Sequence, residues 1–365
     1  MPLTEDVVLK VDGLRLRGFQ EVNITRSMKD AAIAYGLRVT NPAWSSDAFA
    51  VRFAREVELM TGSELLCRGT VDEYESELDE DKREVRISGK SKGVLAARHP
   101  PVKHKTGRVE NKDLLGVAKE FTETGVEWRS DVKLPPIAMV QRHPADSVFA
   151  TVERYARQLG VMLVGQPDGA ILITRGSDKR HTDLSEGQRP MTGYKVKIGQ
   201  KNKASPSVVR NQRRLGTASK DLRDEETVYD PNDGRFRPAI IFGETDQDKQ
   251  SAKNRGEWQR LRQGAFGGLS ATVDVAGWRD ADGVLWEPGR LVFLAIPSER
   301  IEQEMRIESV TFTQNLKDGT TAELTLVDPV TTGAKSKSGT AGAKRNKSDP
   351  GYGVAAPDWT LDQGI

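Results

Sequence analysis

Three acidic side chains lie close together in the segment GWRDADGVLWEPGRLVFLAIP, residues 277–297. Asp280, Asp282 and Glu287 carry the oxygen atoms that bind Ca²⁺ or act as paired carboxylates in catalysis. An EF-hand loop needs a glutamate at its twelfth position, and counting from Asp280 that position is Leu291. The spacing therefore does not fit a calcium loop.

The same segment carries the pattern of a β-hairpin. Asp282-Gly283 is a strong signal for a tight turn, and Trp278 and Trp286 flank it. Two aromatic side chains across such a turn commonly pair on one face of the sheet. Pro288-Gly289 supplies a second turn. The segment therefore predicts a structural hairpin rather than a metal or catalytic site.

Other residues that could do chemistry form no recognisable constellation. The histidines lack the i, i+4 spacing with an acid that marks a zinc protease, and we expect them in solvated loops. They are His99, His104, His143 and His181. The acidic run EYESELDED, residues 73–81, could hold two catalytic carboxylates, but a solvated turn is the commoner structure. We predict no catalytic, cofactor-binding or metal-binding residues, no cofactor and no small-molecule substrate.

The composition is typical of a polar globular chain made of several small domains. Its 365 residues are 36% hydrophobic and 30% charged, which gives much surface relative to core. The net charge of +2 predicts neither nucleic-acid coating nor membrane binding. Cys67 is the single cysteine, so a disulfide framework is excluded and a reducing compartment is expected. The N-terminus lacks a signal-peptide pattern, and no apolar run approaches the ~18 residues of a membrane span. We therefore expect a soluble protein made in the cytosol.

One basic stretch departs from this balance, because residues 187–220 contain no acid. A phosphate backbone or an acidic protein surface could bind its side chains. Few aromatic residues are interleaved to stack bases, so a solvated loop or a protein partner is favoured. The candidate partner contacts are Lys195, Lys197, Lys201, Lys203, Arg210, Arg213 and Arg214.

Hydrophobic patterning predicts β-rich ends and a mixed middle. Near the N-terminus, alternating apolar residues surround an Asp12-Gly13 turn, and RSMKDAA (26–32) contains a possible one-turn helix. In the middle, KDLLGVAKEF (112–121) and ADSVFATVERYARQLG (145–160) predict helices. A hairpin over residues 167–169 follows. The small middle domain is therefore predicted to be α/β.

These patterns divide the chain into four parts. We expect a first β-barrel domain at 1–97 and a small α/β domain at 98–178. A second β-barrel domain at 179–330 carries an inserted loop and helix at about 217–266. Residues 331–365 are rich in glycine, serine, alanine and lysine, which predicts a flexible tail. The fold class is α+β, β-rich and multidomain.

A weak internal repeat relates the two ends. Val85 follows Val71 by fourteen residues, and Leu324 follows Val310 by the same step. A glutamate precedes the first apolar residue of each return strand. Hairpins of similar length also arise by chance, so the repeat is a hypothesis: one related barrel at each end of the chain.

Three long segments together resemble a known family. They are residues 11–40, beginning VDGLRLRGF, residues 141–175, beginning QRHPADSVF, and residues 256–326, beginning GEWQRLRQGAFGG. In this order they resemble the baseplate central hub protein (the P-type tail protein) of Mu-like contractile-tailed phages and prophages. The resemblance covers about residues 5–330, rests on no single short motif, and leaves the phage Mu member as one candidate identity.

The resemblance implies a structural role in the virion. Hub proteins of this kind form homotrimers that join the tail spike to the tail tube, with two barrel domains per chain, so that six similar barrels match both symmetries. It implies contacts with the spike, the tube and other baseplate proteins, assembly in the host cytoplasm, and DNA only in transit through the channel. Such an adaptor needs no catalysis.

Two other functions stay open at this point. A cell-wall-degrading tail enzyme would need a carboxylate pair or a metal site in a cleft. A nucleic-acid-binding module would rely on the basic stretch. Lysis of purified peptidoglycan would favour the first, and salt-sensitive DNA retardation the second.

Overall fold

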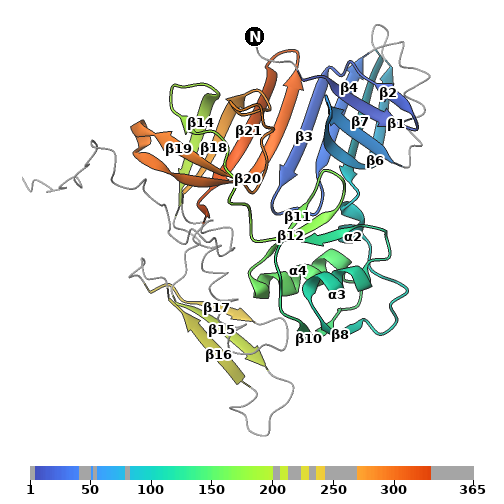
Figure 1. Ribbon diagram of the computed structural model, residues 1–365, viewed down its shortest axis with the longest axis vertical. Coiled ribbons are helices and arrows are strands. Elements are labelled where there is room, and N and C mark those ends of the chain that lie inside the picture. The colour runs from blue at the N-terminus through green and yellow to red at the C-terminus, as the bar shows by residue number, and fades with distance from the viewer. Residues whose placement is uncertain are drawn as a thin grey trace, which may run out of the picture.

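Strands dominate the computed structural model of this chain (Figure 1). The structure describes residues 5–40, 51, 56–78, 83–199, 206–212, 223–229, 236–242 and 269–329. Within these ranges the predicted β-rich composition is confirmed. The inserted helix expected near residue 245 and the tail at 331–365 fall outside the described residues.

Strands make up most of the described residues at the first end of the chain. Its strands are β1 (Val7–Val11), β2 (Leu14–Leu16), β3 (Glu21–Ser27), β4 (Ala34–Thr40), β5 (Val57–Thr61), β6 (Glu64–Leu78) and β7 (Arg83–Ser91). The Asp12-Gly13 turn is confirmed, with both residues at positive φ. The one-turn helix expected at 26–32 is wrong. The backbone N–H of Met28 donates to Glu308 at 2.9 Å and its side chain is buried, so β3 extends to Ser27 and a bend follows.

The middle of the chain mixes helices and short strands. Its elements are α2 (Val94–Arg98), β8 (Arg108–Lys112), α3 (Leu114–Phe121), β9 (Trp128–Ser130), β10 (Ile137–Gln141), α4 (Val148–Leu159), β11 (Met162–Gly165) and β12 (Ile171–Thr174). α4 is capped by the Ser147 side chain and ends at Gly160 in the left-handed conformation. α3 begins after Asp113, whose carboxylate accepts from the Gly116 N–H. No helix among the described residues has the length and apolar character needed to cross a membrane.

The other end returns to strands. They are β13 (Leu184–Ser185), β14 (Met191–Ile198), β18 (Leu269–Ala276), β19 (Leu291–Ile296), β20 (Ile301–Asn315) and β21 (Gly319–Val327), with one 3₁₀ turn, η2 (Pro297–Glu299). A separate small sheet contains β15 (Ser207–Gln212), β16 (Arg223–Val228) and β17 (Ala239–Phe242). β16 lies where a loop was expected, because the run Arg223–Val228 pairs with β15 along its length.

The two ends of the chain share one sheet. Its path runs β14-β18-β21-β20-β3-β4-β7-β6-β5-β1-β2, and the antiparallel pair β20–β3 joins the last part of the chain to the first. The described strands follow an open path, so two closed barrels are not found among them. The physical reason is that β20 is long enough to pair with β19 over its first part and with β3 over its second.

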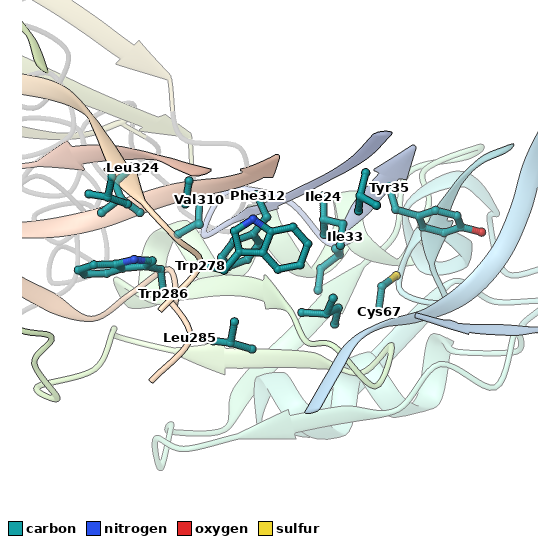
Figure 2. Close-up of a cluster of buried hydrophobic side chains, with 14 of the residues drawn as sticks. Ile24, Ile33, Tyr35, Cys67, Trp278, Leu285, Trp286, Val310, Phe312 and Leu324 are labelled. Carbon is teal, nitrogen blue, oxygen red and sulfur yellow. The ribbon is translucent and has the colours of Figure 1, made fainter. Parts of the chain in front are cut away.

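The described residues form two hydrophobic clusters. One joins both ends, and Figure 2 shows Ile24 and Tyr35 from the first end near Trp278 and Phe312 from the last. The other lies within the middle segment, around Phe121, Trp128 and the buried face of α4. The first and last segments therefore fold around a common core.

Candidate functional site

The acidic segment near residue 280 is a hairpin whose first carboxylate turns inward. One oxygen of Asp280 accepts from the N–H groups of Asp282 (3.1 Å) and Val284 (2.9 Å), which is how a short acidic side chain stabilises its own turn. Gly283 has φ of 78°, as the turn requires. The predicted hairpin is confirmed.

The two tryptophans of the hairpin pack apart rather than against each other. Trp278 lies 5.2 Å from the ring of Phe312, and its indole N–H donates to the Thr313 carbonyl at 3.1 Å. Trp286 lies 4.8 Å from the ring of His181. Both indoles are buried, so they anchor the hairpin to two different neighbours.

His181 is buried and paired, which corrects the expectation of a solvated loop histidine. Its Nδ1 lies 2.7 Å from Asp280 Oδ2, and its Nε2 accepts from the Glu287 N–H at 3.1 Å. An accepting Nε2 places the proton of the neutral ring on Nδ1, which donates to Asp280. Burial lowers the pKa of His181 below its ordinary value, against the opposing effect of Asp280. Both side chains are buried, and their contact holds residue 181 against the hairpin that contains Asp280.

The other histidines differ in exposure. His104 accepts from the Gly107 N–H at 3.2 Å and packs edge-on against Phe121, so it is held in place. His143 lies 3.8 Å from Asp146 at the surface, and His99 is exposed. Among the described residues, no group of three or more histidine, cysteine, aspartate or glutamate side chains is placed to hold a metal ion.

The acidic run is a strand over its first six residues rather than a turn. Residues 73–78 continue β6 and pair with β7. Glu73, Glu75 and Glu77 are exposed and occupy alternate positions, so they lie on one face of the strand. Glu75 lies 3.7 Å from Arg86, with both side chains more than half exposed. The period-two spacing of these glutamates was the sequence signal for this strand.

The basic stretch is divided between two sheets. Lys195 and Lys197 are exposed on β14 and share a face, while Tyr194 and Val196 are half-buried on the other face. Arg210 lies on β15, where its Nε is 2.9 Å from Glu225. The remaining predicted contacts, Lys201, Lys203, Arg213 and Arg214, lie outside the described residues.

Several strands of the large sheet have an open edge within the described part of the chain, among them the short end strand β2, the other end strand β14 and part of β6. β14 pairs with β18 alone. The second part of β6, residues 73–78, pairs with β7 alone, since β5 covers β6 only as far as Gly69. Each edge leaves a row of backbone donors and acceptors available, and such rows are templates for pairing with another strand.

Both ends of the chain match families of tail proteins. Residues 6–91 match the family described as Mu phage baseplate assembly protein GpP-like, N-terminal. Residues 264–329 match a tail protein C-terminal domain. The chain is similar to the baseplate hub protein gp44 of Escherichia phage Mu, at 22% identity over 340 residues, covering 89% of this chain and 88% of that protein.

Solved structures with the same fold also come from tail proteins. The 43 kDa tail protein of prophage MuSo2 from Shewanella oneidensis superposes with a TM-score of 0.77 at 24% identity, covering 90% of this chain and 99% of that one. The tail protein from Neisseria meningitidis MC58 gives 0.76 at 18% identity, covering 91% and 99%. The resemblance to Mu-like tail proteins is confirmed, and 22% identity makes the Mu protein a relative rather than this chain itself.

Proposed function

We propose that this chain is the central hub of a contractile-tail baseplate, and that three copies join a threefold spike to a sixfold tail tube. One observation carries the proposal: the strand order β3-β4-β7-β6-β5 at one end is repeated as β14-β18-β21-β20-β19 at the other. Two similar units per chain make six in a trimer, which can match threefold and sixfold partners at once. The likeness to the Mu hub protein over most of both chains supports the same role.

The role is mechanical. Residues 1–97 and 179–330 serve as the two tube-like domains around the small domain at 98–178. The partners are other copies, the spike, and the tube or other baseplate proteins. DNA passes through the lumen of the ring in the virion tail, so strong positive charge should not line it. The basic stretch therefore faces a protein.

The first test is the absolute mass of the purified chain, alone and with its spike protein, by native mass spectrometry. A mass of three chains, with imaging that shows a ring of six similar lobes, is the expected result. A chain that stays monomeric at micromolar concentration even with the spike present would refute the hub. A peptidoglycan digestion assay would then test the enzymatic alternative.

A further inference from the structure

The two units agree in detail as well as in strand order. β6 and β20 are both 15 residues long, and β7 and β21 are both 9. Each long strand has one register shift against the return strand that follows it, between Val71 and Glu73 where β6 pairs with β7 and between Ile307 and Ser309 where β20 pairs with β21. A second shift, where β6 pairs with β5, has no counterpart between β20 and β19. Bulges of this kind fix the register of a strand, so they align the two units residue by residue.

This alignment differs from the sequence repeat by three residues on β6 and by two on β7. Val310 pairs with Leu324, as the fourteen-residue step suggested, but Tyr74 is the residue that pairs at the equivalent place, with Ile87. The same alignment can be extended to the strands next to β7 and β21, because their registers are known. Because β3–β4–β7 and β14–β18–β21 pair in the same pattern, Ile24 of β3 is equivalent to Val196 of β14.

The equivalence exposes one missing strand pair. In the second unit, residues 309–315 of β20 pair with β3, the first strand of the first unit. In the first unit, the equivalent part of β6 has no such partner within the described residues. β14, the first strand of the second unit, also has no partner on its outer edge among the described strands (Figure 1). β6 and β14 lie at opposite sides of the sheet, so one chain cannot pair them.

We propose that β6 of one copy pairs antiparallel with β14 of the next copy, in the register that β20 and β3 use within the chain. This inference rests on the proposed function, since it needs several copies in a ring. Carrying the internal register across gives five opposed pairs: Tyr74 with Ile198, Glu75 with Lys197, Ser76 with Val196, Glu77 with Lys195, and Leu78 with Tyr194.

Charge complementarity supports this register. Glu75 faces Lys197 and Glu77 faces Lys195, on the same side of the strand pair. A shift of one residue would place each glutamate opposite an uncharged residue, because side chains alternate along a strand. Opposite charges across an antiparallel pair stabilise it, and like charges destabilise it.

The other side of the strand pair supports it as well. Leu78 and Ile198 are 79% and 69% exposed, which is unusual for large apolar side chains on paired strands. In the proposed register Leu78 of one copy covers Tyr194 of the next copy, and Ile198 of that next copy covers Tyr74 of the first. The internal seam has the same arrangement, with buried Ile24 opposite buried Phe312 on one face. Its other face is polar, with Thr25 and Thr311 hydroxyls 3.4 Å apart.

The contact joins two different surfaces, so it can be repeated from copy to copy. Repetition of such a contact closes into a ring or grows into a filament, depending on the rotation between copies. In a ring of three, internal seams and intermolecular seams would alternate around six units. The lysines of β14 then face the acidic strand of the next copy.

Engineered disulfides test the register in the full-length chain. The variant Glu75→Cys/Lys197→Cys places two thiols directly opposite, at the ~5 Å separation that a disulfide accepts. The matched control Glu73→Cys/Lys195→Cys uses the same two strands but is four residues out of register, or roughly 13 Å. The native Cys67 is buried and stays silent in both. Native mass of each variant and a non-reducing gel are the measurements.

We expect most of the first variant to become a covalent trimer after oxidation and the control to stay unlinked. A trimer by native mass in which the control links, or in which neither variant links, overturns the proposed seam and leaves the hub intact. A chain that remains monomeric with its spike present, with no disulfide, overturns the seam and the hub together.

Charge reversal tests the same seam without new covalent bonds. Glu75→Lys/Glu77→Lys should weaken trimer formation at least about tenfold, because four cations then meet across the strands. Adding Lys195→Glu/Lys197→Glu should restore it. The control Glu110→Lys/Glu153→Lys makes the same charge change on the middle segment and should leave the trimer unchanged. The variant with all four substitutions could fail to regain the trimer although its thermal melting matches that of the native chain. That result would count against the seam.

Discussion

The internal seam between β3 and β20 and the open edges of β6 and β14 occupy equivalent places in the two units, yet their side chains differ. The internal seam is mostly neutral and polar on one face, where Thr25 lies opposite Thr311. Its other face buries Ile24 and Phe312 completely and carries one buried cation, Arg26. The open edges carry glutamates on one strand and lysines on the other. We attribute this difference in side chains to the stage at which each strand pair forms, during folding for the internal seam and during assembly for the open edges.

A seam within one chain forms as the chain folds, so it can rely on apolar burial. An edge that waits for another molecule must stay soluble and must avoid the wrong partner. Two acidic β6 edges repel each other, as do two basic β14 edges, and only the unlike pair attracts. Natural sheets use charged residues on edge strands to prevent indiscriminate pairing. Placing opposite charges on the two edges adds a preference for one partner.

The largest expected effect comes from the internal seam. Phe312→Ala removes a fully buried ring that packs on Trp278, and should lower the free energy of unfolding by about 3–5 kcal/mol. Leu78→Ala at the open edge should change the stability of the monomer by less than about 0.5 kcal/mol, since the side chain is exposed. Urea unfolding of dilute, monomeric protein measures both. Equal losses would mean that the two places are energetically alike.

A smaller effect should separate the buried His181–Asp280 pair from the exposed charges. His181→Gln should lower the free energy of unfolding by about 1–3 kcal/mol at pH 7.5, because it disturbs two buried hydrogen bonds. The pKa of His181 in the folded chain lies below the unfolded value of 6.5. Below pH 6.5 the unfolded chain therefore binds more protons, so stability is fully present above that pH and is lost as the pH falls toward the folded pKa.

The pH dependence is checked by urea unfolding at intervals between pH 7.5 and pH 5. The native chain should lose stability over this range more steeply than His181→Gln, which cannot titrate at that position. Parallel curves for the two proteins would show that the imidazole does not titrate differently in the folded and unfolded states.

Local patterns in the sequence predicted most of the secondary structure. The Asp12-Gly13 and Asp282-Gly283 turns, the capped helix α4 and the strands around them follow from residue type and spacing. The failures came from contacts distant in sequence. Met28 is held by a hydrogen bond to Glu308, and His181 is buried by Asp280, 99 residues away.

The candidate assembly surface was only half visible in the sequence. The basic residues of β14 stand out because residues 187–220 lack acids. The acidic strand was interpreted as a turn, since a run of glutamates favours solvent whatever its backbone conformation. Which edge is open depends on the pairing of β20 with β3, which joins residues almost 300 positions apart and leaves no local pattern.

The smallest expected effect is on salt dependence, and it tests whether charge distinguishes the two seams. Exposed ion pairs contribute little each and are screened at high ionic strength. Raising sodium chloride from 0.05 M to 0.5 M should therefore weaken each intermolecular seam roughly fivefold. The unfolding of the monomer should stay nearly unchanged, because most opposed pairs in the internal seam are uncharged and its cation Arg26 is buried, where added salt screens little. Mass photometry across a dilution series measures the first quantity, and urea unfolding the second. Glu75→Gln/Glu77→Gln supplies the control, since its assembly should be weaker at low salt and insensitive to added salt. If the trimer tightens with salt instead, burial of Leu78 and Ile198 dominates the seam and its charges serve chiefly to exclude the wrong edges.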